Sequence, residues 1–124
     1  MVPPSLRRRL NCSNWMKKVC SWPKDEPLMV KYHDKEWGKP IRSDRKIFEF
    51  LVLESAQAGL SWLTILRKRE GYRRAFANFE PSSVARFGAR DVSKLIKNPN
   101  IIRNRLKIEA AINNAKKFLE VQRE

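Results

Sequence analysis

The chain has little acidic charge and no long hydrophobic run, and each absence excludes a class of protein. It carries 13 Asp and Glu against 27 Lys and Arg, so its formal net charge is +14 over 124 residues. Such an excess of positive charge favours polyanionic partners, nucleic acid above all. Even the run from Ile47 to Leu53 is broken by Glu49, whereas a membrane span needs about 20 apolar residues. We therefore expect no membrane span, and we prefer nucleic acid to a basic membrane-surface helix because the charge is spread along the chain.

Cysteine, histidine and glycine are also scarce. Cys12, Cys20 and His33 are the only cysteines and the only histidine, and no CxxC motif occurs. A structural zinc needs four ligands, so these residues by themselves favour a thiol and an ordinary histidine over a metal site. The four glycines form neither a GxGxxG nor a P-loop pattern. No nucleotide cofactor is therefore expected.

The first 19 residues form a basic segment without any acid and without the apolar core of a secretory signal. We expect residues 1–19 to be a poorly ordered basic arm, with a transit peptide as the alternative. The length of the chain suits one domain, expected over residues 20–124. The lack of an export signal points to the cytoplasm.

The hydrophobic pattern predicts an all-α fold. Residues 20–43 are rich in tryptophan and punctuated by proline, which is typical of loops with short helical turns. Beyond them we expect a helix capped by Asp44 and ended by Gly59, and a second helix capped by Ser61. Three short helices are expected next, over 72–79, 81–87 and 91–96. The clearest helix is the last, where apolar residues recur at helical spacing from Ile108 to Leu119.

Glu54 is the residue whose position is most unusual. It shares one predicted helix face with Ile47, Leu51 and Ala58, and that face is otherwise apolar. A carboxylate buried there would have a raised pKa, fit for proton transfer or for binding a cation. The alternative is a carboxylate at the edge of the face that reaches water or an arginine.

Aromatic residues cluster around this helix in the sequence. Trp22, Tyr32, Trp37 and Trp62 lie in the segments that flank it. Their rings could stack on a nucleobase, at about 1–3 kcal/mol per base, and a cationic base would add a cation–π attraction. They could equally be core anchors of a loop-rich segment.

Four motifs in register give the sequence a family resemblance. They are C-x-W followed by P-L and Y-H-D-x-E-W-G in residues 20–38, L-E-S-A-Q-A-G-L-S-W in 53–62, R-K-R-E-x-Y-R-x-A-F in 67–76, and I-I-R-N-R-L-K-I-E-A-A-I-N-N-A in 101–115. Over residues 20 to 121 the chain resembles the N-terminal half of the DNA-3-methyladenine glycosylase I family, all-α enzymes of the helix-hairpin-helix glycosylase superfamily.

The resemblance implies a function and a site. Members of the family excise 3-methyladenine from alkylated double-stranded DNA without a lysine Schiff base, and we expect a monomer. The family's active-site glutamate falls on Glu54. The aromatic residues of its base pocket fall on Tyr32 and Trp62, and Trp37 and Trp22 support them nearby.

The resemblance also implies a structural zinc, whose first two ligands fall on Cys20 and His33. The other two ligands and the DNA-gripping helical hairpin belong to the family's C-terminal segment, which has no counterpart here. We therefore expect zinc to be weakly held or absent, unless Cys12 replaces a ligand. We expect a glycosylase whose sequence here is a fragment, with a non-catalytic remnant that binds nucleic acid or protein as the alternative.

Overall fold

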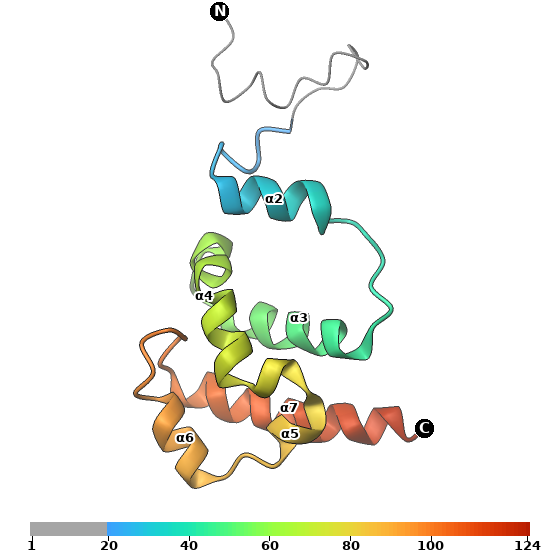
Figure 1. Cartoon of the computed structure of the whole chain (residues 1–124), viewed down its shortest axis with the longest axis vertical. Helices are drawn as coiled ribbons and strands as arrows, with labels where there is room; N and C mark the ends of the chain where they lie inside the picture. Colours follow the sequence, from blue (N-terminus) through green and yellow to red (C-terminus); the bar gives the residue numbers. More distant parts are fainter. Residues whose placement is uncertain (1–19) are drawn as a thin grey trace, which may run out of the picture. The chain divides into compact units, whose positions relative to one another are not determined.

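A computed structural model describes residues 20–124, and this part of the chain consists of helices joined by turns (Figure 1). It contains six α-helices and one 3-10 helix, and no strand lies in the described range. The all-α prediction is confirmed. The structure divides into two compact units, one ending at Lys39 and one spanning Pro40–Glu124. The predicted basic arm and Cys12 lie outside the described residues.

The described part of the first unit, residues 20–39, contains one helix, α2 (Pro27–Lys35), in the stretch expected to hold loops and short helical turns. Proline suits its first turn because the missing N–H would have no helical partner there. The helix ends where the backbone N–H groups of Glu36 and Trp37 both donate to the carbonyl of Tyr32. Gly38 follows with a φ of +72°, a left-handed conformation that glycine adopts without strain.

The second unit begins with the helices α3 (Asp44–Ala56) and α4 (Trp62–Ala75). The predicted cap of α3 is off by one residue. Ser43, not Asp44, is the N-cap, because its hydroxyl accepts from the Lys46 backbone N–H. The prediction that Ser61 caps α4 is confirmed, since its hydroxyl accepts from the Thr64 N–H.

The predicted helix over 72–79 is wrong. Its first residues continue α4 as far as Ala75, and a left-handed turn follows, the 3-10 element η1 (Ala77–Phe79). All three residues of η1 have φ values between +50° and +57°. This conformation costs non-glycine residues about 1–2 kcal/mol each, and it places Phe79 fully inside the core. Burial of an aromatic ring offsets part of that cost.

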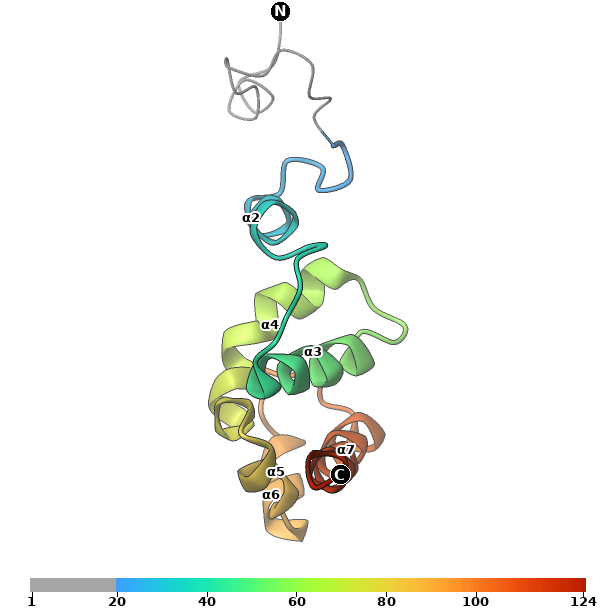
Figure 2. The same ribbon diagram turned by 90° about the vertical axis from the view of Figure 1, so that its right-hand side faces the viewer.

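The remaining helices are α5 (Pro81–Ala85), α6 (Ala89–Leu95) and α7 (Arg105–Gln122). They match the last three predicted helices to within a few residues at each end. α7 packs mainly on α5 and also contacts α3 and α6 (Figure 2). The apolar face predicted for α7 is buried at Ile108, Ala111, Ile112 and Ala115.

The core of the second unit is built around phenylalanine. The Phe48 ring of α3 lies 5.5 Å from that of Phe118 on α7 and 6.5 Å from that of Phe79 (centroid distances). Phe76 stacks between Tyr72 and Phe79. This core fixes α3 and α4, the two helices that carry the predicted site residues of this unit. None of the helices in the described range is long and apolar enough to cross a membrane.

Candidate functional site

Glu54 lies on the exposed side of α3. The buried side of this helix consists of Phe48, Glu49, Val52, Leu53 and Ala56. The helix face predicted from the spacing of Ile47, Leu51 and Glu54 is therefore not the face that packs in the core. Ile47 and Leu51 are 36% and 45% exposed, and Glu54 is exposed with them. Of the two interpretations of Glu54, a buried carboxylate or one that reaches water, the structure supports the second. It stands beside solvent-facing apolar side chains.

The turn that joins Glu54 to Trp62 is held in place from a distant part of the sequence. Gly59 gives the turn its left-handed residue, with a φ of +79°. Lys107 of α7 donates from Nζ to the carbonyl oxygens of Ala56 at 2.9 Å and Ala58 at 2.6 Å. These carbonyls lie at the C-terminal end of α3, where helical partners run out and a cation is favourable.

Trp62 starts α4 and is buried, with 8% of its surface exposed. Its burial favours the core-anchor alternative for this tryptophan. Glu54 and Trp62 thus lie on consecutive helices of one unit, joined by the turn that Lys107 holds.

The carboxylate that enters the core is Glu49, which the sequence analysis did not single out. It is 5% exposed and pairs with Nε of Arg69 at 2.6 Å and with Nη2 of Arg73 at 3.0 Å. The Arg69 guanidinium also lies 5.2 Å from the centre of the Phe50 ring. A signal was present, because Arg69 follows Trp62, Ile65 and Leu66 at the spacing of the buried α4 face.

The first unit brings three of the aromatic and metal-binding candidates together. The Trp22 ring lies 6.4 Å from Tyr32 and 6.1 Å from His33. Tyr32 is 8% exposed, whereas Trp22 and Trp37 are 49% and 64% exposed. The two tryptophans are therefore the accessible aromatic rings of this unit over residues 20–39.

Within the part of the chain that the structure describes, the candidate ligands do not make a complete metal centre. Cys20 is exposed and His33 is paired through Nδ1 with the Asp34 carboxylate at 2.9 Å. Over residues 20–124, no three side chains of the histidine, cysteine or carboxylate type gather where they could hold a metal ion. A tetrahedral zinc site requires four donors, so Cys20 and His33 cannot form one by themselves.

Comparison with known proteins agrees with this arrangement of helices. The family model for methyladenine glycosylase matches residues 22–124. The DNA-3-methyladenine glycosylase of Haemophilus influenzae is 45% identical over 108 residues, 87% of this chain and 58% of that protein. DNA-3-methyladenine glycosylase 1 of Escherichia coli is 47% identical over 103 residues, 83% of this chain and 55% of that protein.

Solved structures give the same result. A crystal structure of 3-methyladenine DNA glycosylase I matches with a TM-score of 0.82 and 46% identity, covering 86% of this chain and 58% of that one. The Staphylococcus aureus enzyme matches with a TM-score of 0.81 and 43% identity, covering 84% and 55%. This chain thus spans a little over half the length of these relatives. The match to the family model runs through nearly all of the described residues, and the chain belongs to the methyladenine glycosylase family.

Proposed function

We propose that this protein is a DNA glycosylase that excises 3-methyladenine from alkylated DNA, with Glu54 as the residue that recognises the damaged base. The observation that carries the proposal is the placement of Glu54. It is an exposed carboxylate bordered by the exposed apolar side chains of Ile47 and Leu51, in a chain that is 45% and 47% identical to relatives named for this activity.

The surroundings of Glu54 suit a flat, positively charged ligand. N3-methylation leaves the adenine in its nucleoside with a positive charge, which ordinary bases lack. An apolar border lowers the local dielectric and strengthens the attraction between a carboxylate and such a cation. Neutral purines would gain nothing from the charge. Glu54 therefore supplies selectivity for the methylated base.

The exposed aromatic rings are proposed to hold the base by stacking. Within the first unit these are Trp22 and Trp37, with Tyr32 packed beside Trp22. Within the second unit, the mostly buried Trp62 follows Glu54 on the next helix and is proposed as a further base contact. Two similar structures are of enzyme variants, one with a tyrosine and one with a glutamate replaced. The tyrosine variant was solved with 3-methyladenine. The tyrosine and the glutamate replaced in those two structures are 22 residues apart in their printed numbers. Tyr32 and Glu54 are also 22 residues apart in this chain.

The proposed reaction needs no general acid from the protein. The base must first leave the duplex stack, at a cost of a few kcal/mol that is smallest for a damaged pair. The bond between N9 and C1′ then breaks, its electron pair goes to the cationic base, and 3-methyladenine leaves as a neutral molecule without protonation. Water adds to the oxocarbenium carbon of the sugar and loses a proton to solvent. The step needs no proton from Glu54, which acts by binding the cation and orienting the water.

The cytoplasm, with its DNA, is the proposed site of action, and a monomer is the proposed active form. Alkylated DNA is the proposed partner because 27 basic side chains against 13 acidic ones favour a polyanion. We further propose that a zinc ion is held only weakly by Cys20 and His33, since two donors do not close a site. Titration of the metal-free protein with Zn²⁺ should show no high-affinity binding.

Base release tests the proposal. The protein is incubated with alkylated duplex DNA, and the freed bases are separated and identified by chromatography. We expect 3-methyladenine from the wild type and a roughly ten- to hundredfold slower release from Glu54→Gln, the loss of one charge-assisted contact of about 1.5–3 kcal/mol. Glu120→Gln, an exposed carboxylate on α7, is the matched control and should release base at the wild-type rate.

The alternative function is binding of nucleic acid or of a protein without catalysis, and it is a candidate because the chain spans 58% and 55% of the two relatives. Duplex binding by a folded protein with no release of any methylated base would favour it. Equal rates for wild type and Glu54→Gln would instead refute the role given to Glu54 while leaving the activity in place.

A further inference from the structure

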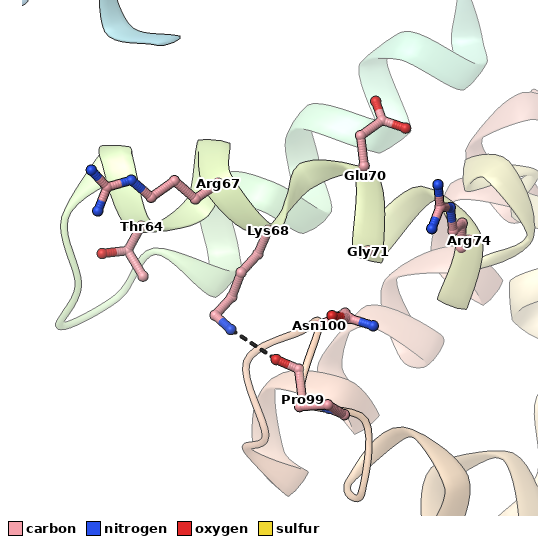
Figure 3. A pocket seen from close by; sticks show the side chains of 8 residues that line it. All are labelled: Thr64, Arg67, Lys68, Glu70, Gly71, Arg74, Pro99 and Asn100. Carbon is pink, nitrogen blue, oxygen red and sulfur yellow. Dashed lines mark hydrogen bonds between the residues drawn. The ribbon is translucent and has the colours of Figure 1, made fainter. Parts of the chain in front are cut away.

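A basic pocket lies on α4, on the side of the helix away from its buried face. Its volume is about 460 Å³, and it is formed by α4 and the turn at residues 99–100 (Figure 3). The α4 side chains that line it include Thr64, Arg67, Lys68 and Arg74. Arg67, Lys68 and Arg74 follow Thr64 at three, four and ten residues, which places the four along one stripe of the helix.

The floor of the pocket depends on a glycine. A Cβ at Gly71 would lie 2.2 Å from the backbone oxygen of Asn100, so only glycine allows the turn to approach α4 so closely. Lys68 ties the turn down by donating from Nζ to the Pro99 carbonyl at 2.9 Å (Figure 3). The pocket is therefore a fixed feature of the second unit.

The charge of the pocket suits an anion. Three cations line it, at Arg67, Lys68 and Arg74, against one acid, Glu70. The Glu70 carboxylate is paired with Nη1 of Arg73, and its side chain points away from Asn100 (Figure 3). The residues that line the pocket therefore carry more positive than negative charge. Guanidinium groups bind phosphate oxygens through two parallel hydrogen bonds, and the Thr64 hydroxyl and the Asn100 amide are further donors.

We propose that this pocket binds a backbone phosphate of DNA. The inference rests on the proposed action on DNA and adds a contact that lies apart from the base-recognition residues. Arg67 and Arg74 lie two helical turns apart, roughly 10 Å along the axis, so they grip the backbone at two points. Such a contact contributes affinity without reading sequence.

The slope of binding against salt tests the site. Binding of an undamaged duplex is measured over a range of salt concentrations for the wild type and for the pair Arg67→Gln with Arg74→Gln. Each lost phosphate contact lowers the slope of log affinity against log salt by about 0.9, so the pair should lower it by roughly two. Both side chains are exposed, and unchanged melting of the pair by circular dichroism verifies its fold.

The pair Arg86→Gln with Arg90→Gln is the matched control. It removes the same charge from exposed positions outside the pocket and should leave the slope as it was. An equal fall in slope for both pairs would overturn the proposal, because the effect would then follow net charge alone. Failure of the wild type to bind duplex would also overturn it.

A second measurement distinguishes a DNA phosphate from a small free anion as the ligand of the pocket. Inorganic phosphate is titrated while the amide signals of Asn100 and Gly71 are followed by NMR. Shifts of these signals together with an unaffected duplex slope would mean that the pocket takes a free anion, and the proposal would fail. The proposed function fails separately, because it is measured as base release, which can be absent while the salt slope still depends on Arg67 and Arg74.

Discussion

Replacement of Gly71 by alanine tests how closely the turn at residues 99–100 approaches α4. An ideal Cβ at this position would lie 2.2 Å from the Asn100 oxygen and 2.7 Å from the Asn100 Cβ. A Cβ makes ordinary van der Waals contacts from 3.4 Å, so the turn must withdraw by roughly 1 Å or the helix must bend. Overpacking of this kind costs about 1–3 kcal/mol.

Two effects oppose each other in this variant. Alanine in a helix interior is about 1 kcal/mol more favourable than glycine, so the overpacking cost must exceed that gain for the variant to lose stability. The two figures leave a net loss of up to about 2 kcal/mol in the free energy of unfolding, measured by urea denaturation and equivalent to roughly 4–8 °C in Tm per kcal/mol. Phosphate binding at the neighbouring pocket should weaken as well.

Gly88→Ala is the control for this measurement. A Cβ at Gly88 meets no atom within 4 Å, so only a small change from the N-cap of α6 is expected. A Gly71→Ala variant that is more stable than the wild type would refute the reasoning, because it would show that the turn does not press on the helix.

Three further perturbations follow from the contacts of the second unit. Glu49→Gln should destabilise the unit by about 3–5 kcal/mol in a urea titration, because it leaves the buried Arg69 without its anion; a loss below 1 kcal/mol would contradict the buried pair. Burial raises the pKa of Tyr72, although the hydrogen bond from the Ile102 N–H lowers it in part. The unfolded chain therefore loses this proton first, so stability is fully present below pH 10 and falls as the pH rises further; Tyr72→Phe should show a smaller fall across that range. Lys107→Met should speed amide hydrogen exchange at the end of α3, and unchanged exchange there would contradict the cap.

Sequence patterns predicted the helices more reliably than their faces. Local signals decide helix ends, such as the Ser61 hydroxyl at the start of α4 and Pro81 at the start of α5. The prediction missed the buried face of α3 because this helix carries apolar side chains on more than one face. The set with Ile47 and Leu51 fits helical spacing as well as the set with Phe48 and Val52. Only packing against other helices separates the two sets.

Long-range contacts had no local signal at all. Nothing in the sequence around Lys107 distinguishes it from other surface lysines. Its role depends on a turn some fifty residues away. The end of α4 was misread for the same reason, because burial of Phe79 overrides the helical preference of its neighbours. The motifs around Glu54 and Tyr32 pointed to the family without any knowledge of these contacts.

Recognition of the methylated base by Glu54 is the central claim, and binding of free 3-methyladenine tests it without DNA. The methylated base and unmodified adenine are titrated into wild-type protein, Glu54→Gln and the control Glu120→Gln, and binding is followed by calorimetry. The titrations are run at a pH low enough to protonate the free methylated base, because the released base is neutral. Under that condition we predict that the wild type and the control prefer 3-methyladenine to adenine, and that Glu54→Gln loses roughly tenfold or more of that preference. An undiminished preference in Glu54→Gln would contradict the account.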